Sequence, residues 1–546
     1  MLSRNRWLSA VLLALVAGLL AVGCGGDDDG GEDGGGGAAA ADQTLKWGLG
    51  SEFLLDPGLA TDTTSSKILS NILDPLVKLN DDLEAEAAAA ERWEENGKVI
   101  TFTLREGMTW TNGDPVTAAD YEFAWKRALS PELGSDYAYQ LTGIQGAAEY
   151  NECESNCARM RDQVMVEATD DRTLRVTLTN PQPWFIEQVA HHVFLPVNQK
   201  VVEQFGERWT RAENIVTNGA FMVEDAQPSA SITLVKNPDW RDAANVKLER
   251  VEGRIIVDGT TAVQSFEAGE VDVLDEQLPP AEIPRLKDTP EYELYQGLGS
   301  TYYGFNVKNV TDINQRRAMS LAIDRRQIID TITQANELPA KGFTPEGMPG
   351  FETIVGEGSP WTPEQADVEQ AKELMAQVGN AKQRVAIVTN EGDPNRDVAV
   401  AVQAMWEEIG IQSTIRVMEW QQYLEHLGPP PPGSVDVFRL GWVGDFVDDI
   451  NFLELWTCDS GNNNTGFCNE EYDALVAKAK ATPDDAERTE IYRQLEAMLT
   501  GEDGELPFIP MWSITYNNLE RETVKETFEI NLLDQVDLTT VEIKEG

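Results

Sequence analysis

The chain has 546 residues, 41% of them hydrophobic and 14 of them tryptophan, which is enough for two or three domains with large cores and excludes global disorder. Its formal net charge of −50 argues against nucleic acid or an anionic membrane surface as a partner. The acidic residues are spread along the chain, as on a solvated surface, so they indicate little about mechanism.

The first 24 residues have the pattern of an export signal. Arg4 and Arg6 form a basic region, and residues 8–20 form an apolar stretch that is too short for a standard transmembrane helix. This stretch ends in Leu-Ala-Val-Gly-Cys, which resembles a bacterial lipobox in which Cys24 becomes the lipidated first residue. Cleavage at a small residue without lipidation is the alternative. Residues 25–41, rich in Gly, Asp and Ala, predict a flexible tether.

The cysteine pattern fits an exported protein. With Cys24 lipidated, four cysteines remain in two local pairs, Cys153 with Cys157 and Cys458 with Cys468. Because an exported chain meets an oxidising environment, we predict two disulfides that close short loops. A zinc site is the competing interpretation, but the spacings do not fit a zinc knuckle and the chain has only three histidines. We therefore expect no metal and no cofactor.

Along the chain the pattern is that of an α/β protein. A first strand is expected at residues 45–49, and Thr117 is expected to cap a helix with Asp120 three residues on. A capping box at Thr362 predicts a helix that runs to residue 378. The next elements form a βαβ unit with parallel strands: a strand at 384–389, a helix at 394–409 and a strand at 411–417.

The segment 435–445 combines three chemically distinct side chains. It begins as a strand and then breaks into a glycine-punctuated loop that carries Trp442 and Asp445, with Arg439 before them. Ligands bind at the C-terminal ends of strands in open α/β sheets. A guanidinium can hold a carboxylate and a carboxylate can hold an ammonium group, so the pair suits a zwitterion such as a peptide. The alternative is a buried Arg–Asp pair that joins two strands.

Several motifs together resemble the signature of the family 5 extracellular solute-binding proteins, which are the peptide-binding receptors of ABC importers. The resemblance becomes specific in residues 91–120, which include Trp110-Thr-Asn-Gly-Asp-Pro115, and covers nearly the whole chain after the tether. It continues through the segments 184–185, 195–197, 205–209, 214–221, 236–240, 267–272, 302–306 and 316–325.

This resemblance implies an α/β, two-lobed periplasmic-binding-protein fold with a hinge and an extra α/β domain inserted in the first lobe. We expect the signal peptide and lipobox at residues 1–24 and the tether at 25–41. The first lobe is then expected at 42–80, 206–300 and 520–546, the inserted domain at 81–205, and the second lobe at 301–519.

The resemblance also assigns binding roles. The family motif Arg-x-Gly-Trp-x-x-Asp matches residues 439–445, so Asp445 would pair with the α-ammonium group of a peptide. Arg439 would help to hold the other peptide end or an acidic group, and Trp420 would form an aromatic pocket wall. The remaining ligand-binding residues expected on this basis are Trp442, Tyr302, Tyr303, Glu52 and Asn462.

The function implied is that of a monomeric receptor, lipid-anchored on the outer (periplasmic or extracellular) face of the cell membrane. It would capture oligopeptides and deliver them to the permease and ATPase subunits of an ABC transporter. A receptor for a non-peptide solute, such as an opine or an oligosaccharide, and a sensor of peptide signals without transport are the alternatives. No G-x-S-x-G or H-E-x-x-H motif and no Cys–His couple is present, so we expect no enzyme and no catalytic residue.

Overall fold

The structure is a computed structural model that describes residues 42–80, 83–275, 278–392, 394–428 and 431–545. The predicted signal peptide, the lipidated Cys24 and the tether lie outside these residues. Among the described residues, no helix is both long and apolar enough to cross a membrane.

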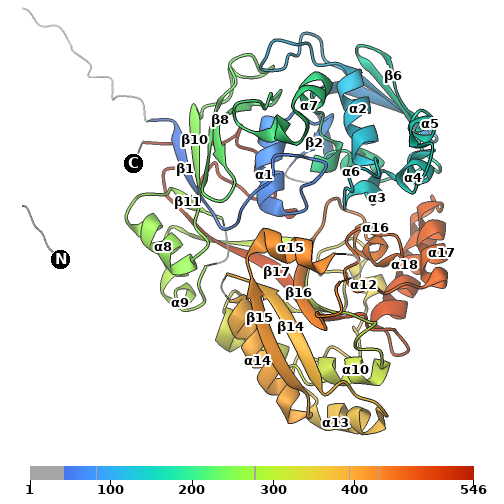
Figure 1. The fold of residues 1–546 in the computed structure, drawn as a ribbon. Coiled ribbons are helices and arrows are strands. Elements are labelled where there is room, and N and C mark those ends of the chain that lie inside the picture. The colour runs from blue at the N-terminus through green and yellow to red at the C-terminus, as the bar shows by residue number, and fades with distance from the viewer. Residues whose placement is uncertain (1–41, 81–82, 276–277, 393, 429–430, 546) are drawn as a thin grey trace, which may run out of the picture. The chain divides into compact units, whose positions relative to one another are not determined.

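A sheet of eleven strands runs through the described chain, in the order β15-β14-β16-β12-β17-β11-β1-β10-β9-β8, with β13 paired to β17 (Figure 1). The long antiparallel strands β12 and β17 join its two halves. The bounds are β1 Thr44–Leu49, β8 Phe221–Gln227, β9 Ser231–Lys236, β10 Arg250–Ile255, β11 Val273–Leu274, β12 Tyr292–Phe305, β13 Leu338–Pro339, β14 Arg384–Asn390, β15 Gln412–Met418, β16 Val437–Val443 and β17 Phe508–Glu520.

The two long strands are irregular where the halves of the sheet meet. The register between β12 and β17 shifts between Gln296 and Ser300, a stretch that contains Gly297 and Gly299. A Cβ atom on Gly299 would lie 2.8 Å from the carbonyl oxygen of Trp442, and one on Gly297 would lie 2.7 Å from the ring of Tyr516. Glycine is therefore required for these strands to approach so closely.

The predicted βαβ unit is confirmed. Strands β14 and β15 pair in parallel, and α14 (Asn395–Glu408) connects them and packs on both (Figure 1). The helix buries Val398, Val402 and Trp406, which lie one turn apart on one face. Trp406 also donates its indole N–H to the carbonyl oxygen of Met319, at 2.8 Å.

Strand β16 is longer than the sequence predicts. It continues through Gly441 and Trp442 to Val443, so only Gly444 and Asp445 of the motif leave the strand. The reason is its partner, since β12 pairs with β16 along the whole stretch from Gly299 opposite Val443 to Phe305 opposite Val437. Tertiary pairing thus overrides the local preference of glycine for a loop.

A separate sheet has the order β4-β5-β7-β6, and α2 packs against β6 and β7. The carboxylate of Asp120 accepts the backbone N–H of Thr117 at 2.8 Å, as the predicted cap requires. This sheet falls within the predicted inserted domain, whose boundaries, like those of the lobes, stay predictions. The strands outside the large sheet are β2 Val77–Leu79, β3 Ala85–Ala87, β4 Ala90–Asn96, β5 Val99–Leu104, β6 Val166–Asp170 and β7 Thr173–Thr177.

The predicted start of the helix after Thr362 is wrong. Helix α13 (Val368–Gln377) begins after Asp367, whose carboxylate accepts the backbone N–H of Gln370 at 2.9 Å. The carbonyl oxygen of Pro363 instead accepts a bond from the guanidinium of Arg325 at 3.1 Å. Tertiary hydrogen bonds therefore hold the apparent capping box in a non-helical form.

Both predicted disulfides are confirmed, one between Cys153 and Cys157 and one between Cys458 and Cys468.

The remaining helical elements cover the sheets. The α-helices are α1 Thr63–Ile72, α2 Ala118–Ala128, α3 Ala138–Leu141, α4 Ala147–Asn151, α5 Cys157–Arg161, α6 Phe185–Gln188, α7 Gln199–Phe205, α8 Gly259–Glu267, α9 Ile283–Leu286, α10 Ile313–Leu321, α11 Arg325–Ile328, α12 Phe351–Ile354, α15 Trp420–Leu427, α16 Ile450–Leu453, α17 Glu470–Lys480 and α18 Asp485–Thr500. Shorter turns are η1 His192–Phe194, η2 Gly206–Thr210, the π-helix η3 Ile329–Thr333, and η4 Glu454–Trp456.

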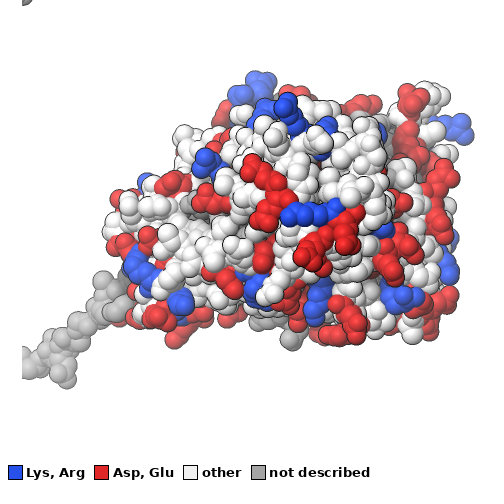
Figure 2. Space-filling view, turned by 90° about the horizontal axis from the view of Figure 1, so that it is seen from below, with Lys and Arg blue, Asp and Glu red and all other residues white. Residues whose placement is uncertain are grey.

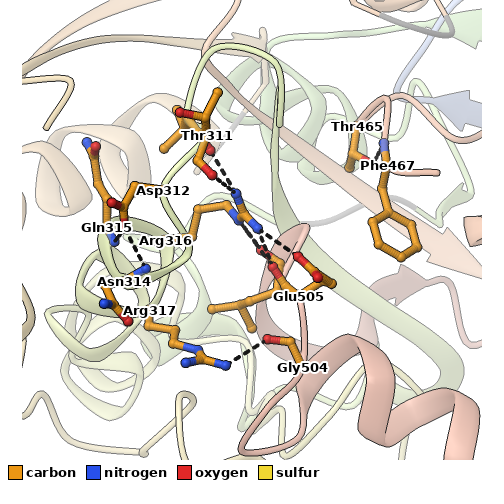
Figure 3. A network of polar contacts seen from close by, with 12 residues as sticks. Thr311, Asp312, Asn314, Gln315, Arg316, Arg317, Thr465, Phe467, Gly504 and Glu505 are labelled. Atoms are coloured by element: carbon orange, nitrogen blue, oxygen red, sulfur yellow. Dashed lines mark hydrogen bonds and ion pairs between the residues drawn. The ribbon is translucent and has the colours of Figure 1, made fainter. Parts of the chain in front are cut away.

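A buried arginine fixes the segment that leads into β17. Arg316 on α10 is 4% exposed, and its guanidinium donates to the carbonyl oxygens of Val310, Thr311, Glu505 and Leu506 at 2.6–3.2 Å (Figure 3). Since β17 forms part of the cavity wall described below, this network helps to position the site. On the face shown in Figure 2, by contrast, acidic side chains are interleaved with basic ones, as expected of a solvated surface.

Replacing this arginine should destabilise the protein. Arg316→Ala leaves several buried carbonyl oxygens without a donor, so the free energy of unfolding should fall by about 3 kcal/mol. The control is Arg326→Ala, which removes one exposed ion pair with Glu364 and should cost less than about 1 kcal/mol. Urea denaturation followed by tryptophan fluorescence measures both. Equal stability losses in the two variants would contradict the role given to Arg316.

Candidate functional site

A cavity of about 410 Å³ lies where the two halves of the large sheet meet. Its walls come from the ends of β1, β14 and β16, from β17, and from the segment that contains His191 and His192. Among the described residues, no group of three or more His, Cys, Asp or Glu side chains could hold a metal ion. Seven of the eight predicted ligand-binding residues line the cavity: Glu52, Tyr302, Trp420, Arg439, Trp442, Asp445 and Asn462.

Tyr303 is the predicted residue that the structure leaves outside the cavity wall. Its side chain is fully buried in a separate hydrophobic cluster with Phe305 and Val437. Tyr303 lies directly opposite Arg439 of β16, so its face of the sheet does contribute to the wall, but its own side chain is packed inside this cluster. Tyr302 packs edge-on against Phe343 and Trp456 and contributes to the wall.

The carboxylate of Asp445 is 7% exposed and receives donors from distant parts of the chain. One oxygen lies 3.1 Å from Nε2 of His191 and 3.5 Å from the hydroxyl of Tyr137. The other accepts the side-chain amides of Gln140 at 2.6 Å and Asn451 at 3.0 Å. An ionised carboxylate has about four acceptor sites, so this one is nearly saturated, with the Tyr137 contact the weakest.

Two aromatic rings extend this cluster. Trp442 stacks on Tyr137 with 6.0 Å between ring centroids and donates its indole N–H to Asn451 at 3.2 Å. Burial and the nearby Asp445 hold the pKa of the Tyr137 hydroxyl well above its usual value, so this phenol stays protonated and acts as a donor. The position of Asp445 is therefore fixed by its neighbours on every side.

Two adjacent histidines complete this end of the cavity. His191 accepts the backbone N–H of Val193 through Nδ1 at 3.3 Å, which leaves Nε2 to donate to Asp445. His192 is 3% exposed and lies 2.9 Å from the carbonyl oxygen of Ala60 through Nε2, and its Nδ1 has no partner among the described residues. Burial, with His191 beside it, lowers the pKa of His192 well below its usual value, so His192 is neutral.

Arg439, unlike Asp445, has no partner for its charged group. No carboxylate or hydrogen-bond acceptor contacts its guanidinium among the described residues, although burial lowers its pKa. The ionisable groups that act on this pKa are the phenols of Tyr302, Tyr303 and Tyr423, which raise it. A partly buried cation without an anion is unfavourable, and this one lines the cavity. Arg439 and Asp445 do not pair with each other, so the structural Arg–Asp pair is wrong, and the guanidinium is free to receive an anionic group.

The other predicted residues form less buried parts of the wall. Trp420 begins α15 and stacks on Tyr423, with 6.1 Å between ring centroids. Asn462 donates to the carbonyl oxygen of Asp136 at 3.3 Å, which ties the second disulfide loop to the segment before α3. Glu52 is half-buried, and no ion pair or hydrogen bond involves its carboxylate among the described residues.

Comparison with known proteins identifies the family. Residues 83–464 match the model of the bacterial extracellular solute-binding proteins, family 5. The oligopeptide-binding protein OppA of Bacillus subtilis is 33% identical over 542 residues, which cover 96% of each chain. The chain belongs to the family 5 extracellular solute-binding proteins.

Solved structures of family 5 proteins agree in fold. Haemophilus influenzae OppA in complex with the peptide RPPGFSPFR superposes with a TM-score of 0.86 and 28% identity, covering 92% of this chain and 99% of that one. The murein tripeptide-binding protein MppA of Escherichia coli gives 0.84 (28% identity, 93% and 100% covered). An unliganded open form of MppA superposes with a TM-score of only 0.63, at 29% identity, covering 93% of this chain and 99% of that one. The chain therefore has the two-lobed binding-protein fold, and its arrangement differs from that open form.

Sequence reasoning missed the residues that hold Asp445. Tyr137, Gln140 and His191 lie about 250 to 310 positions before Asp445, and no local motif links them to it. In the sequence, His191 and His192 enter only as two of the three histidines that are too few and wrongly spaced for a zinc site. The one available signal in the sequence is that two of its three histidines, His191 and His192, are adjacent.

The buried His192 should make stability depend on pH. Its pKa is lower in the folded than in the unfolded protein, so unfolding takes up a proton, and stability is lost as the pH falls below about 6.5. His192→Gln keeps a donor for Ala60 and removes this titration. Between pH 7.5 and 5.5, the wild type should lose about 1 kcal/mol more than the variant. Urea titrations across this range test it, and parallel stability curves for the two proteins would contradict it.

Proposed function

We propose that the protein is the substrate-binding receptor of an ABC transporter, which captures oligopeptides in the cavity and delivers them to a membrane permease. The observation that carries this proposal is the partly buried side chain of Arg439, whose guanidinium lacks an anion among the described residues, in the same wall as the Asp445 carboxylate. Such a wall suits a ligand with one end of each charge. Relatives named as oligopeptide-binding proteins, one of them holding a peptide, support this ligand class.

Asp445 is proposed to bind the α-ammonium group of the peptide. An ammonium has three donors and needs an acceptor that is buried and already oriented. The contact of Asp445 with the Tyr137 hydroxyl, 3.5 Å long, is the one that an ammonium can replace at least cost. Its other three contacts would then keep the carboxylate in place while the ligand binds.

Arg439 is proposed to receive the peptide carboxylate or an acidic side chain. A guanidinium can donate two parallel hydrogen bonds to a carboxylate, and its positive charge is stronger in a buried site than in water. Trp420 and Trp442 would cover the peptide between these ends with flat apolar surface. An extended peptide would satisfy its backbone groups against the protein backbone, and closure of the lobes would bury it.

The remaining parts of the proposal concern the cell. We infer that residues 1–24 direct export, that Cys24 is lipidated, and that the lipid holds the protein on the outer face of the membrane, with residues 25–41 as the tether. The receptor acts as a monomer and catalyses no reaction. These statements rest on the sequence pattern, because the residues concerned lie outside the described structure.

The proposal predicts that both peptide ends are read. The protein without residues 1–41, refolded to remove endogenous ligand, should bind members of a library of two- to eight-residue peptides in calorimetric titrations. N-acetylation should weaken an active peptide at least a hundredfold, because it removes the charge that Asp445 needs. C-terminal amidation should weaken those peptides whose carboxylate meets Arg439.

A variant separates the two ends. Arg439→Met keeps the length of the side chain and removes its charge, so it should bind free-carboxylate peptides at least tenfold more weakly. It should bind the amidated forms of the same peptides much as the wild type does. If the wild type binds opines or oligosaccharides but no peptide in any pool, the proposed ligand class is wrong.

A further inference from the structure

The cavity wall is strongly acidic. Its only arginine or lysine among the described residues is Arg439. The acidic residues of the same wall are eight: Glu52, Asp62, Asp275, Glu337, Glu391, Glu419, Asp445 and Asp534. A peptide that enters this cavity therefore meets a negative potential, which attracts cationic groups and repels anionic ones.

Five of these eight carboxylates already have partners within the protein. Asp62 and Glu419 cap helices α1 and α15 by accepting backbone N–H groups. Asp275 and Asp534 lie 3.0 and 2.8 Å from the ammonium group of the buried Lys67. Asp445 has the four donors described above. These five carboxylates therefore serve to stabilise the protein itself.

Glu337 differs from these residues in that no lysine, arginine or helix N-terminus of the described chain contacts its carboxylate. Its residue is 2% exposed, and one carboxylate oxygen accepts the hydroxyl of Thr333 at 2.7 Å. The other oxygen, Oε1, is buried and has no hydrogen-bond partner among the described residues. Burial raises the pKa of this carboxyl, against the lowering by hydrogen bonds from Thr333 and from the backbone at Glu337 and Ala335. A buried carboxylate oxygen in a cavity wall without a donor is a position where a ligand can supply one.

The surroundings of Glu337 suit a long cationic side chain. Glu337 directly precedes β13, in which Leu338 pairs with Ser513 and Pro339 with Trp512 of β17. Pro339 pairs with Trp512, which places the indole near the segment that carries Glu337. Trp512 also lines the cavity and is 6% exposed. An indole can cover the apolar stem of a lysine or arginine and interact favourably with its charge.

We propose that Glu337, with Trp512 beside it, forms a subsite that binds a lysine or arginine side chain of the ligand, so that the receptor selects cationic peptides. The proposal rests on the proposed function, since it assigns the side-chain preference of the same cavity. The ligand cation supplies the donor that Oε1 lacks, and the excess of wall carboxylates favours it over neutral and acidic peptides. Asp445 remains the partner of the α-ammonium group, so the two charges of the ligand have separate carboxylates.

The test compares side chains that differ in charge alone. Lysine, norleucine and glutamate are placed in turn at each position of tri- to penta-alanine, and binding to the refolded wild type is measured by calorimetry. Norleucine has the apolar stem of lysine without the ammonium group. At one position or more, lysine should bind at least tenfold more tightly than norleucine, and glutamate more weakly than either.

Two variants locate the effect. Glu337→Gln should reduce the lysine-to-norleucine ratio at that position to less than threefold, while its affinity for the alanine and norleucine peptides stays close to wild type, which also shows that the site is folded. Glu346→Gln is the matched control, because Glu346 is exposed and lies outside the cavity wall, and it should keep the full ratio.

The outcomes separate this proposal from the broader one. If alanine peptides bind but the lysine-to-norleucine ratio is near one at every position, the cation subsite is wrong and the peptide receptor stands. A large ratio that survives in Glu337→Gln also overturns the subsite, since another carboxylate then reads the lysine. If no peptide of any composition binds, the proposed function itself fails, and the subsite with it.

Discussion

A carboxylate taken out of water must find donors elsewhere, and Asp445 finds them in two distant segments and in α16, which follows it closely in the chain. The amide of Gln140 on α3, the imidazole of His191 and the amide of Asn451 all converge on it. These contacts join the end of β16 to elements next to the four-stranded sheet, so the geometry of the binding wall and the packing of these parts depend on each other. The lower similarity to an open form of MppA is consistent with an arrangement in which such contacts are made.

Arg439 and Glu337 show the reverse situation. Glu337 is buried and Arg439 is partly buried in the cavity wall, and in each a charged or polar atom lacks a partner among the described residues. Burial without compensation costs stability, and folded proteins avoid it away from functional positions. The contrast with Asp445 divides the wall into groups that the protein satisfies by itself and groups that await a ligand. In our account Asp445 is held in place by its own donors and recognises the α-ammonium group, while Arg439 and Glu337 add selectivity for the other charges of the ligand.

The parts of the fold that sequence reasoning predicted are those that local chemistry decides. The βαβ unit from β14 to β15, the cap of α2 and the two short-range disulfides follow from periodicity, capping and cysteine spacing. The start of α13 could not be predicted, because Arg325 takes the backbone oxygen that a helix would use. The extent of β16 could not be predicted either, because its partner β12 lies more than 130 residues earlier in the chain.

The site divides in the same way. The family motif led to Asp445, Arg439 and Trp442, all in the cavity wall, whereas Tyr302 and Tyr303 could not be distinguished without knowing which other side chains pack on each of them. The donors of Asp445 and the open oxygen of Glu337 are products of long-range packing. A single sequence shows only that residues able to donate or accept such hydrogen bonds are present, not that they meet.

The central claim is that the buried carboxylate of Asp445 recognises the ammonium group of a peptide. The most direct test is a thermodynamic cycle that combines Asp445→Asn with N-acetylation of one active peptide. The account predicts that acetylation costs the wild type at least a hundredfold in affinity, that the variant loses as much for the free peptide, and that acetylation then changes the variant less than threefold. A variant that binds the free peptide like the wild type and remains fully sensitive to acetylation would contradict the account.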